Sequence, residues 1–326
     1  MKLPHRRRFL HLAASAAALP AVSRMARAQT YPTRPVRIVV GFAAGGPNDI
    51  IARLIGQWLS ERLGQQFVID NRPGAASNSA TEAVVRAPPD GYTLLQVSTA
   101  AAINATLYEK LNYDFIRDIA PVAGIIRTSQ IVVVNPSISA TTLPEFIAYG
   151  KTNPGKINMA SPGNGTLPHL AGELFKMMTG VNITFVSYRG DAPALTDLLG
   201  GQVQMMIPAP LASIEYIRAG KLRALAVTTP TRWEGLPDAP TVGEFVPGYE
   251  ASPWFGVGAP KRTASEIVEK LNKEINAALA DSKMGARLAD MGGTALPGLP
   301  ADFGKLIAAE TEKWAKVIRA ANIRAE

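Results

Sequence analysis

The feature that most constrains the fold is the alternation of short β-rich runs with helical segments, which begins near residue 36 and continues to the end of the chain. The pattern opens with 36–41, 50–63, 67–70, 79–86 and 92–97, of which the first, third and fifth are the β-rich runs. A β-α-β-α-β order is typical of parallel strands covered by helices on both faces. The sequence therefore predicts an α/β fold.

The alternation then restarts, as if a second unit of the same kind began. Runs of both types follow one another at 131–134, 143–151, 157–160, 168–179, 183–187, 192–199, 203–207, 211–219 and 222–227. One more β-rich run, at 254–259, precedes two long helical segments, at 265–279 and 302–320. A chain of this length with 47% apolar residues can build two sizeable cores. We therefore predict two α/β lobes.

The first 28 residues have the pattern of a signal peptide. A basic stretch ending at Arg8 is followed by an apolar run from Phe9 to Val22. Ala26-Arg27-Ala28 then provides small residues at the two positions that signal peptidase recognises. The apolar run is too short to cross a bilayer of roughly 30 Å. The arginines before Phe9 also fit the twin-arginine pattern, and an arginine-rich Sec signal is the alternative. By either route we expect export to the periplasm.

Composition excludes several classes of protein. The leader carries six of the 34 basic residues and none of the 26 acidic ones, so the remaining chain has a net charge of about +2. No basic block remains that could follow a phosphate backbone, and nucleic acid is therefore not an expected partner. The chain has no cysteine, which excludes disulfides and thiol chemistry.

No catalytic constellation is found after the leader. The one histidine there, His169, lies four residues before Glu173, a spacing that could hold a metal but is more often a simple helix-face pair, so we expect neither metal nor cofactor. Residues 150–152 resemble the end of a P-loop, but Glu145 occupies the position of its first glycine. Binding without catalysis is therefore expected, and a Rossmann-like hydrolase or transferase is the less favoured alternative.

Polar, glycine-rich segments follow several of the predicted strands, at 43–49, 71–78, 98–104, 161–166 and 189–191. The carboxyl ends of parallel strands meet at the edge of the sheet where open α/β folds bind ligands. Each segment precedes a predicted helix, whose first N–H groups lack partners and attract anions. We therefore predict a cleft that holds a small anion. Residues 37–46 and 156–165 are also similar to each other, which suggests one such loop in each lobe.

The chain after the leader resembles the Bug family, the periplasmic substrate-binding proteins of tripartite tricarboxylate transporters. The resemblance is carried by a series of motifs in a characteristic order: Phe42-Ala43-Ala44-Gly45-Gly46 with Asp49, Asn71-Arg72-Pro73-Gly74-Ala75, Pro89-Asp90-Gly91-Tyr92, Asn153-Pro154-Gly155-Lys156, Gly163-Asn164-Gly165-Thr166 and Gly220-Lys221-Leu222-Arg223. It implies a type II periplasmic binding fold, an α/β fold of two doubly wound lobes joined by two crossover strands. The implied lobes are 29–129 plus 255–326, and 130–254.

The resemblance also implies which residues bind the ligand. The family holds one carboxylate with the backbone of its first glycine-rich loop, which here implies Phe42, Ala44, Gly45, Gly46 and Asp49. The second lobe would recognise the far end of the ligand, with Ser161, Gly165, Thr166 and His169. Further candidates are Ser98 and Asn104 in the first lobe, and Arg189 and Asp191 in the second.

The implied function is a monomeric periplasmic receptor that captures a small organic anion and delivers it to the permease subunits of a tripartite transporter. A ligand-binding partner of a membrane sensor kinase is the alternative on the same fold. Two departures from the family pattern bear on the ligand. The uncharged Pro208-Ala209-Pro210 segment argues against an amino acid, whereas Asp191 argues for one if it faces the cleft. The identity of the anion therefore stays open.

Overall fold

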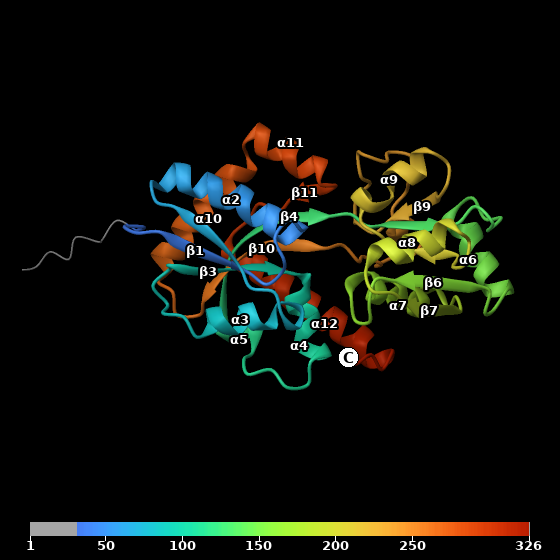
Figure 1. The fold of residues 1–326 in the computed structure, drawn as a ribbon, viewed down its shortest axis with the longest axis horizontal. Helices are drawn as coiled ribbons and strands as arrows, with labels where there is room; N and C mark the ends of the chain where they lie inside the picture. Colours follow the sequence, from blue (N-terminus) through green and yellow to red (C-terminus); the bar gives the residue numbers. More distant parts are fainter. Residues whose placement is uncertain (1–30, 326) are drawn as a thin grey trace, which may run out of the picture.

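The computed structural model describes residues 31–325 and consists of two α/β lobes that lie side by side (Figure 1). The predicted signal peptide lies outside the described residues. One lobe contains a six-stranded sheet in the order β11-β4-β10-β3-β1-β2, and the other a five-stranded sheet in the order β7-β6-β8-β5-β9. The predicted α/β fold with two lobes is confirmed.

Lobe 1 combines the beginning and the end of the described chain. Its strands are β1 (Val36–Val40), β2 (Phe67–Asn71), β3 (Thr93–Ser98), β4 (Ile119–Thr128), β10 (Trp254–Pro260) and β11 (Gly293–Ala295). Its helices are α2 (Pro47–Leu63), α3 (Asn78–Val85), α4 (Thr99–Leu107), α5 (Phe115–Asp118), α10 (Ser265–Leu279), α11 (Ser282–Asp290) and α12 (Pro300–Ala320). Strand β1 pairs in parallel with β2 and β3, as the β-α-β order predicts, whereas β10 is antiparallel to both its neighbours.

Lobe 2 is formed by the middle of the chain. Its strands are β5 (Ile131–Val134), β6 (Ile157–Ser161), β7 (Ile183–Ser187), β8 (Met205–Met206) and β9 (Arg223–Val227). Its helices are α6 (Leu143–Thr152), α7 (Leu167–Thr179), α8 (Asp191–Leu199) and α9 (Pro210–Arg218). Strand β6 is parallel to β7 and β8, and β5 is antiparallel to β8 and β9.

Two elements that position the site differ from the sequence prediction. The segment 98–104 is predicted to be a loop, but all of it after Ser98 belongs to helix α4. Its three consecutive alanines favour a helix, and with one large apolar residue, Ile103, the segment shows no helical periodicity. Strand β4 was not predicted at all. Pro121 and Gly124 interrupt its apolar run, and the ladder with β10 is irregular next to the pair Gly258 and Pro121, where proline cannot donate a hydrogen bond.

Two connecting segments run between the sheets and are hydrogen-bonded to each other. The amide of Thr128 donates to the carbonyl of Pro253 over 2.8 Å, and the amide of Gln130 donates to Oγ1 of Thr228 over 3.1 Å. Strands β4 and β10 belong to the sheet of lobe 1, and β5 and β9 to that of lobe 2. We propose 29–129 plus 255–326, and 130–254, as the extents of the two lobes.

The apolar core continues from one lobe into the other. One cluster fills the face of the lobe 1 sheet that α2 and α10 cover, with Ile38, Ile55 and Leu271 among its buried residues. A second begins on the opposite face and extends through Trp314 of α12 to Phe175 of α7 in lobe 2. Full burial of such a side chain stabilises a fold by about 1.5–3 kcal/mol. None of the helices within residues 31–325 combines the length and the apolar character that a membrane span requires.

Candidate functional site

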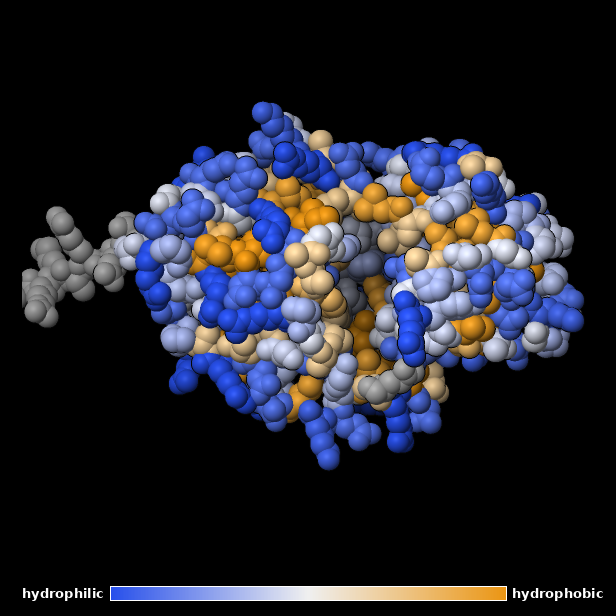
Figure 2. All heavy atoms as spheres, in the orientation of Figure 1, coloured by the Kyte–Doolittle hydropathy of each residue, from blue (hydrophilic) through white to orange (hydrophobic). Residues whose placement is uncertain are grey.

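A hollow separates the two lobes (Figure 2). In lobe 1, β1, β2 and β3 are followed by α2, α3 and α4; in lobe 2, β6 and β7 are followed by α7 and α8. The amino-terminal end of α2 and the loops before α7 and α8 point into the space between the lobes (Figure 1). The loops expected to meet a ligand are thus brought to one region.

The loop before α2 is held in shape by Asp49. Its Oδ2 accepts from the amide of Gly45 over 2.8 Å and from Nε of Arg53 over 2.9 Å. Arg53 also donates to Asn71, and Asn71 donates through Nδ2 to the carbonyl of Phe42 over 3.1 Å. The Arg53 guanidinium lowers the pKa of the buried Asp49 carboxyl. Asp49 therefore acts by positioning the loop, together with Arg53 and Asn71, which the site prediction did not include.

The backbone of this loop leaves donors free. The amides of Ala44 and Gly46 have no hydrogen-bond partner among residues 31–325, and Gly46 caps α2 without a side-chain cap. Gly45 has φ +85°, a left-handed conformation that favours glycine. Gly46 has φ −83°, and a Cβ added there would meet only the carbonyl oxygen of Ala43, at 3.7 Å. The backbone conformation of Gly46 therefore does not require a glycine. The missing side chain instead leaves the backbone amides of the loop open to a ligand.

The loop before α7 repeats this arrangement in lobe 2. The amide of Gly165, with φ +69°, donates to Nδ1 of His169 over 3.1 Å. In both lobes a left-handed glycine donates to a buried side chain four residues later, in the first turn of the next helix. The two loops are thus structurally equivalent, with Gly165 and His169 in the places of Gly45 and Asp49, in a register shifted by one residue from the sequence similarity between 37–46 and 156–165.

The polar side chains of the α7 loop are hydrogen-bonded within the loop. The hydroxyls of Ser161 and Thr166 both donate to the carbonyl of Gly163, over 2.8 and 2.7 Å. The loop also touches lobe 1, because a Cβ on Gly165 would lie 2.6 Å from the side chain of Leu107 in α4. These residues therefore shape the edge of the hollow, and their hydroxyls can still accept a hydrogen bond.

The turn before α3 has a strained backbone. Ala75, Ala76 and Ser77 all have positive φ, at 45°, 50° and 81°, which costs non-glycine residues about 1–2 kcal/mol each. Nδ2 of Asn104 donates to the carbonyl of Ala76 over 2.7 Å and to Asn78 over 2.8 Å. Asn104 lies inside α4, not in a loop, and it supports this turn.

Three other predicted residues have side chains without partners. Ser98 is the N-terminal cap of α4, and its buried hydroxyl makes no hydrogen bond among residues 31–325. Arg189 and Asp191 are exposed in the loop between β7 and α8, and neither has a hydrogen bond or ion pair within the described chain. Neighbouring groups that displace water from the Asp191 carboxyl raise its pKa. These three groups stay available to a ligand.

The pair His169 and Glu173 is engaged within lobe 2. Nδ1 of His169 accepts from Gly165, and its ring packs edge-on against Phe185 at 4.9 Å between centroids. Glu173 forms an ion pair with Lys176 at 3.6 Å. Among residues 31–325 no three potential metal ligands come together.

We expect His169 to make the stability of the protein depend on pH. Burial and the nearby Lys176 lower its pKa below the ordinary 6.5, and a protonated ring could no longer accept from Gly165. The unfolded chain therefore takes up the proton first, and stability is lost as the pH falls below 6.5 through the folded pKa. Urea unfolding of wild type and His169→Gln between pH 8 and 5 checks this. Any effect of Glu173 on the pH dependence of stability is the same in both proteins. The expectation would therefore be contradicted if the free energy of unfolding of wild type and of His169→Gln changed in parallel with pH.

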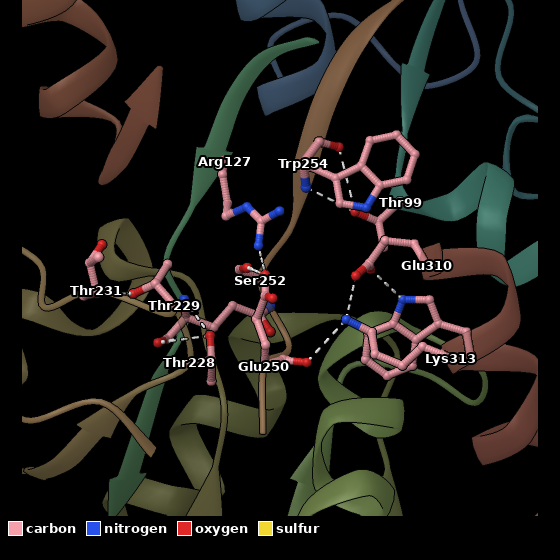
Figure 3. Close-up of polar contacts among 12 residues, drawn as sticks. Thr99, Arg127, Thr228, Thr229, Thr231, Glu250, Ser252, Trp254, Glu310 and Lys313 are labelled. Carbon is pink, nitrogen blue, oxygen red and sulfur yellow. Dashed lines mark hydrogen bonds and ion pairs between the residues drawn. The ribbon is translucent and has the colours of Figure 1, made fainter. Parts of the chain in front are cut away.

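The crossover region contains a cluster of charged side chains that the sequence did not indicate (Figure 3). Arg127, at the end of β4, forms an ion pair with Glu250, which also accepts from the hydroxyl of Ser252 over 2.9 Å. Lys313 of α12 donates to the backbone carbonyl of Glu250 over 3.2 Å and forms an ion pair with Glu310. Helix α12 is thus attached to the segment that returns from lobe 2 to lobe 1.

Comparison with known proteins identifies the family. The model of the tripartite tricarboxylate transporter family receptor, TctC, matches residues 51–323. Protein BugT of Bordetella pertussis is 38% identical over 295 residues, which cover 90% of each chain. The structure of R. palustris Rpa4515 with adipate has 40% identity and a TM-score of 0.76, and covers 90% of this chain and 99% of that one. MatC of Rhodopseudomonas palustris with bound malate has 32% identity and a TM-score of 0.71, over 88% and 100% of the two chains.

These relatives match along nearly the whole of their own length. The family is one of transporter receptors, and a further solved member, from Polaromonas, is a TctC solute-binding protein. Their two-lobed fold agrees with the sheets and crossovers described above. The resemblance noted in the sequence is therefore confirmed, and the chain belongs to the TctC, or Bug, family of periplasmic solute-binding receptors.

Proposed function

We propose that this protein captures a small organic acid between its lobes in the periplasm and delivers it to the permease subunits of a tripartite transporter. The observation that carries the proposal is the loop before α2, whose Ala44 and Gly46 amides are free while Asp49 and Asn71 hold the loop in place. A carboxylate there would accept from these amides at the positive end of the α2 dipole.

The ligand class is supported by two relatives. A protein with 40% identity was solved with adipate and another with 32% identity was solved with malate, and both ligands are small carboxylic acids. The near carboxylate lies at Ala44 and Gly46 of lobe 1, beside the hydroxyl of Ser98. The loops before α7 and α8 close over the rest of the ligand from lobe 2.

Closure proceeds by rotation about the two connecting segments, and the closed form is what the permease recognises. A bound ligand contacts both lobes only in the closed form and therefore binds that form more tightly than the open one. This difference in affinity shifts the population toward the closed form. The chain acts as a monomer and reaches the periplasm through its leader.

The proposal is tested on the protein purified without its leader. Ligand released by denaturation is identified by mass spectrometry, and a panel of mono-, di- and hydroxycarboxylates is tested for a shift in melting temperature. A ligand at 100 times its Kd should stabilise the protein by about 2.7 kcal/mol. Absence of any released acid, together with no shift across the panel, would refute carboxylate binding.

A further inference from the structure

Ser77, in the strained turn before α3, is a buried serine whose hydroxyl has no partner in the described chain. Only 8% of the residue is exposed. Its amide donates to the carbonyl of Gly74 over 3.0 Å, and its carbonyl accepts from Oγ1 of Thr81 over 3.1 Å. Its Oγ makes no hydrogen bond among residues 31–325 and still reaches solvent. An unpaired hydroxyl at a buried position is costly, and a partner from outside the chain would offset that cost.

The two usual reasons for the residue type at such a position do not explain this serine. Ser77 is the N-terminal cap residue of α3, where a serine hydroxyl normally accepts from a backbone amide of the first turn, but it forms no such bond. Its φ of +81° is a left-handed conformation that glycine adopts readily and that is strained in a serine. Strained residues of this kind often lie at functional sites. The serine therefore serves neither the helix nor the turn.

The hydroxyl of Ser77 lies against the beginning of the loop before α2. A Cβ added at Gly41, the residue that follows β1, would overlap with Oγ of Ser77. Gly41 does not have a positive φ, so a glycine is needed there to make room for this hydroxyl. The position of Ser77 is thus tied to the loop that contains the free amides of Ala44 and Gly46.

The pairing of the strands explains why these two segments meet. Strands β1 and β2 are adjacent and parallel, so the connections that follow them, before α2 and α3, leave the sheet side by side. Nδ2 of Asn71 joins the two connections by its hydrogen bond to the carbonyl of Phe42. Because the amino-terminal end of α2 points into the space between the lobes (Figure 1), the hydroxyl of Ser77 borders the same space.

We propose that Ser77 is a ligand-binding residue, whose hydroxyl donates to the near carboxylate of the organic acid alongside the amides of Ala44 and Gly46. This inference rests on the proposed function, in which the carboxylate lies at these amides, and it adds a third donor. A carboxylate can accept about four hydrogen bonds, so two amides leave it room for the hydroxyl. Hydrogen bonds to a charged acceptor are stronger than those between neutral groups.

Isothermal titration of two Ser77 variants with adipate and hexanoate tests the proposal. Both acids have the near carboxylate, and only adipate has a second one. Ser77→Ala keeps Cβ and removes the hydroxyl, and its affinity for both acids should fall by the same factor, about 10- to 100-fold. Ser77→Gly should lose affinity equally, while its midpoint of urea unfolding rises because glycine adopts the left-handed conformation without strain. A purely structural role of Ser77 would not combine higher stability with weaker binding.

Ala76→Gly is the matched control. Ala76 precedes Ser77 in the same turn and has φ +50°, and its carbonyl remains available to Nδ2 of Asn104. This variant should also unfold at a higher urea concentration, because it relieves the same kind of strain, but it should keep both affinities of wild type.

Three results would overturn the inference while leaving carboxylate binding by wild type intact. They are unchanged affinity in Ser77→Ala, an effect on adipate without one on hexanoate, and a loss of affinity in Ala76→Gly as large as that in Ser77→Gly. The second would assign the hydroxyl to the far end of the ligand, and the third would assign the effect to the rigidity of the turn. If wild type bound neither acid and released no acid on denaturation, the proposed function and this inference would be refuted together.

Discussion

Replacing Gly46 by valine is expected to abolish binding of the organic acid while leaving cooperative unfolding intact. The backbone of Gly46 is in an extended conformation that valine adopts readily, and the nearest atom to an added Cβ is 3.7 Å away. The fold therefore accommodates the side chain. A branched side chain would nevertheless cover the free amides of Ala44 and Gly46, where the carboxylate is proposed to lie. The ligand-induced rise in melting temperature should disappear. At a ligand concentration of 100 times the wild-type Kd, this corresponds to a loss of about 2.7 kcal/mol of ligand-induced stabilisation.

Gly200→Val provides the matched control. Gly200 also has a negative φ, of −75°, and lies at the far end of α8, where the nearest atom to an added Cβ is 3.5 Å away. This variant should keep the affinity of wild type. If Gly46→Val bound the ligand as tightly as Gly200→Val, the loop before α2 would not be the carboxylate site.

Replacing Glu310 by alanine is expected to destabilise the protein by about 3 kcal/mol. Glu310 is buried, accepts from Nε1 of Trp314 over 2.9 Å and forms an ion pair with Lys313. Burial lowers the pKa values of Lys313 and Arg127, and the nearby Glu310 carboxylate acts in the opposite direction on both, stabilising their charged forms. Removing Glu310 leaves Lys313 without its counter-charge and the Trp314 indole without its acceptor. The free energy of unfolding in urea measures the effect.

Glu312→Ala, two residues further along α12, is the control. Glu312 pairs with Lys316 on the surface, where both side chains are 70% exposed, and such pairs contribute about 0–1 kcal/mol. A similar loss of stability in both variants would show that α12 is sensitive to any substitution and that the buried cluster at the crossover has no special role.

The candidate site was partly predictable because it lies on local sequence signals. Glycine-rich loops after predicted strands indicated the loops before α2 and α7 without knowledge of the fold. The positioning role of Asp49 was harder to predict, although Arg53 follows it at a spacing that places the two on one helix face. The part played by Asn71 could not be foreseen, because it depends on β1 and β2 being adjacent in the sheet.

Ser161, Thr166 and His169 illustrate the limit of reading a loop by its residue types. Hydroxyl and imidazole groups at a cleft edge are predicted to recognise the ligand. In the folded loop the two hydroxyls donate to the backbone and the imidazole accepts from it, so what the hydroxyls still offer a ligand is an acceptor. Sequence specifies which donors and acceptors are present. It does not specify which of them a folded loop satisfies internally, and that decides what is left for a ligand.

The sequence by itself determined the alternation of strands and helices, and with it the α/β class, the two lobes and the loops at the strand ends, because these follow from periodicity and glycine placement along short segments. Only the tertiary structure decided which side chains hold the loops and which stay free. It also placed α12 across the crossover, where Glu310 and Lys313 meet Glu250 and Arg127 from distant parts of the chain. The physical reason is that pairing of charges and burial of apolar surface depend on proximity in space, which local propensity does not encode.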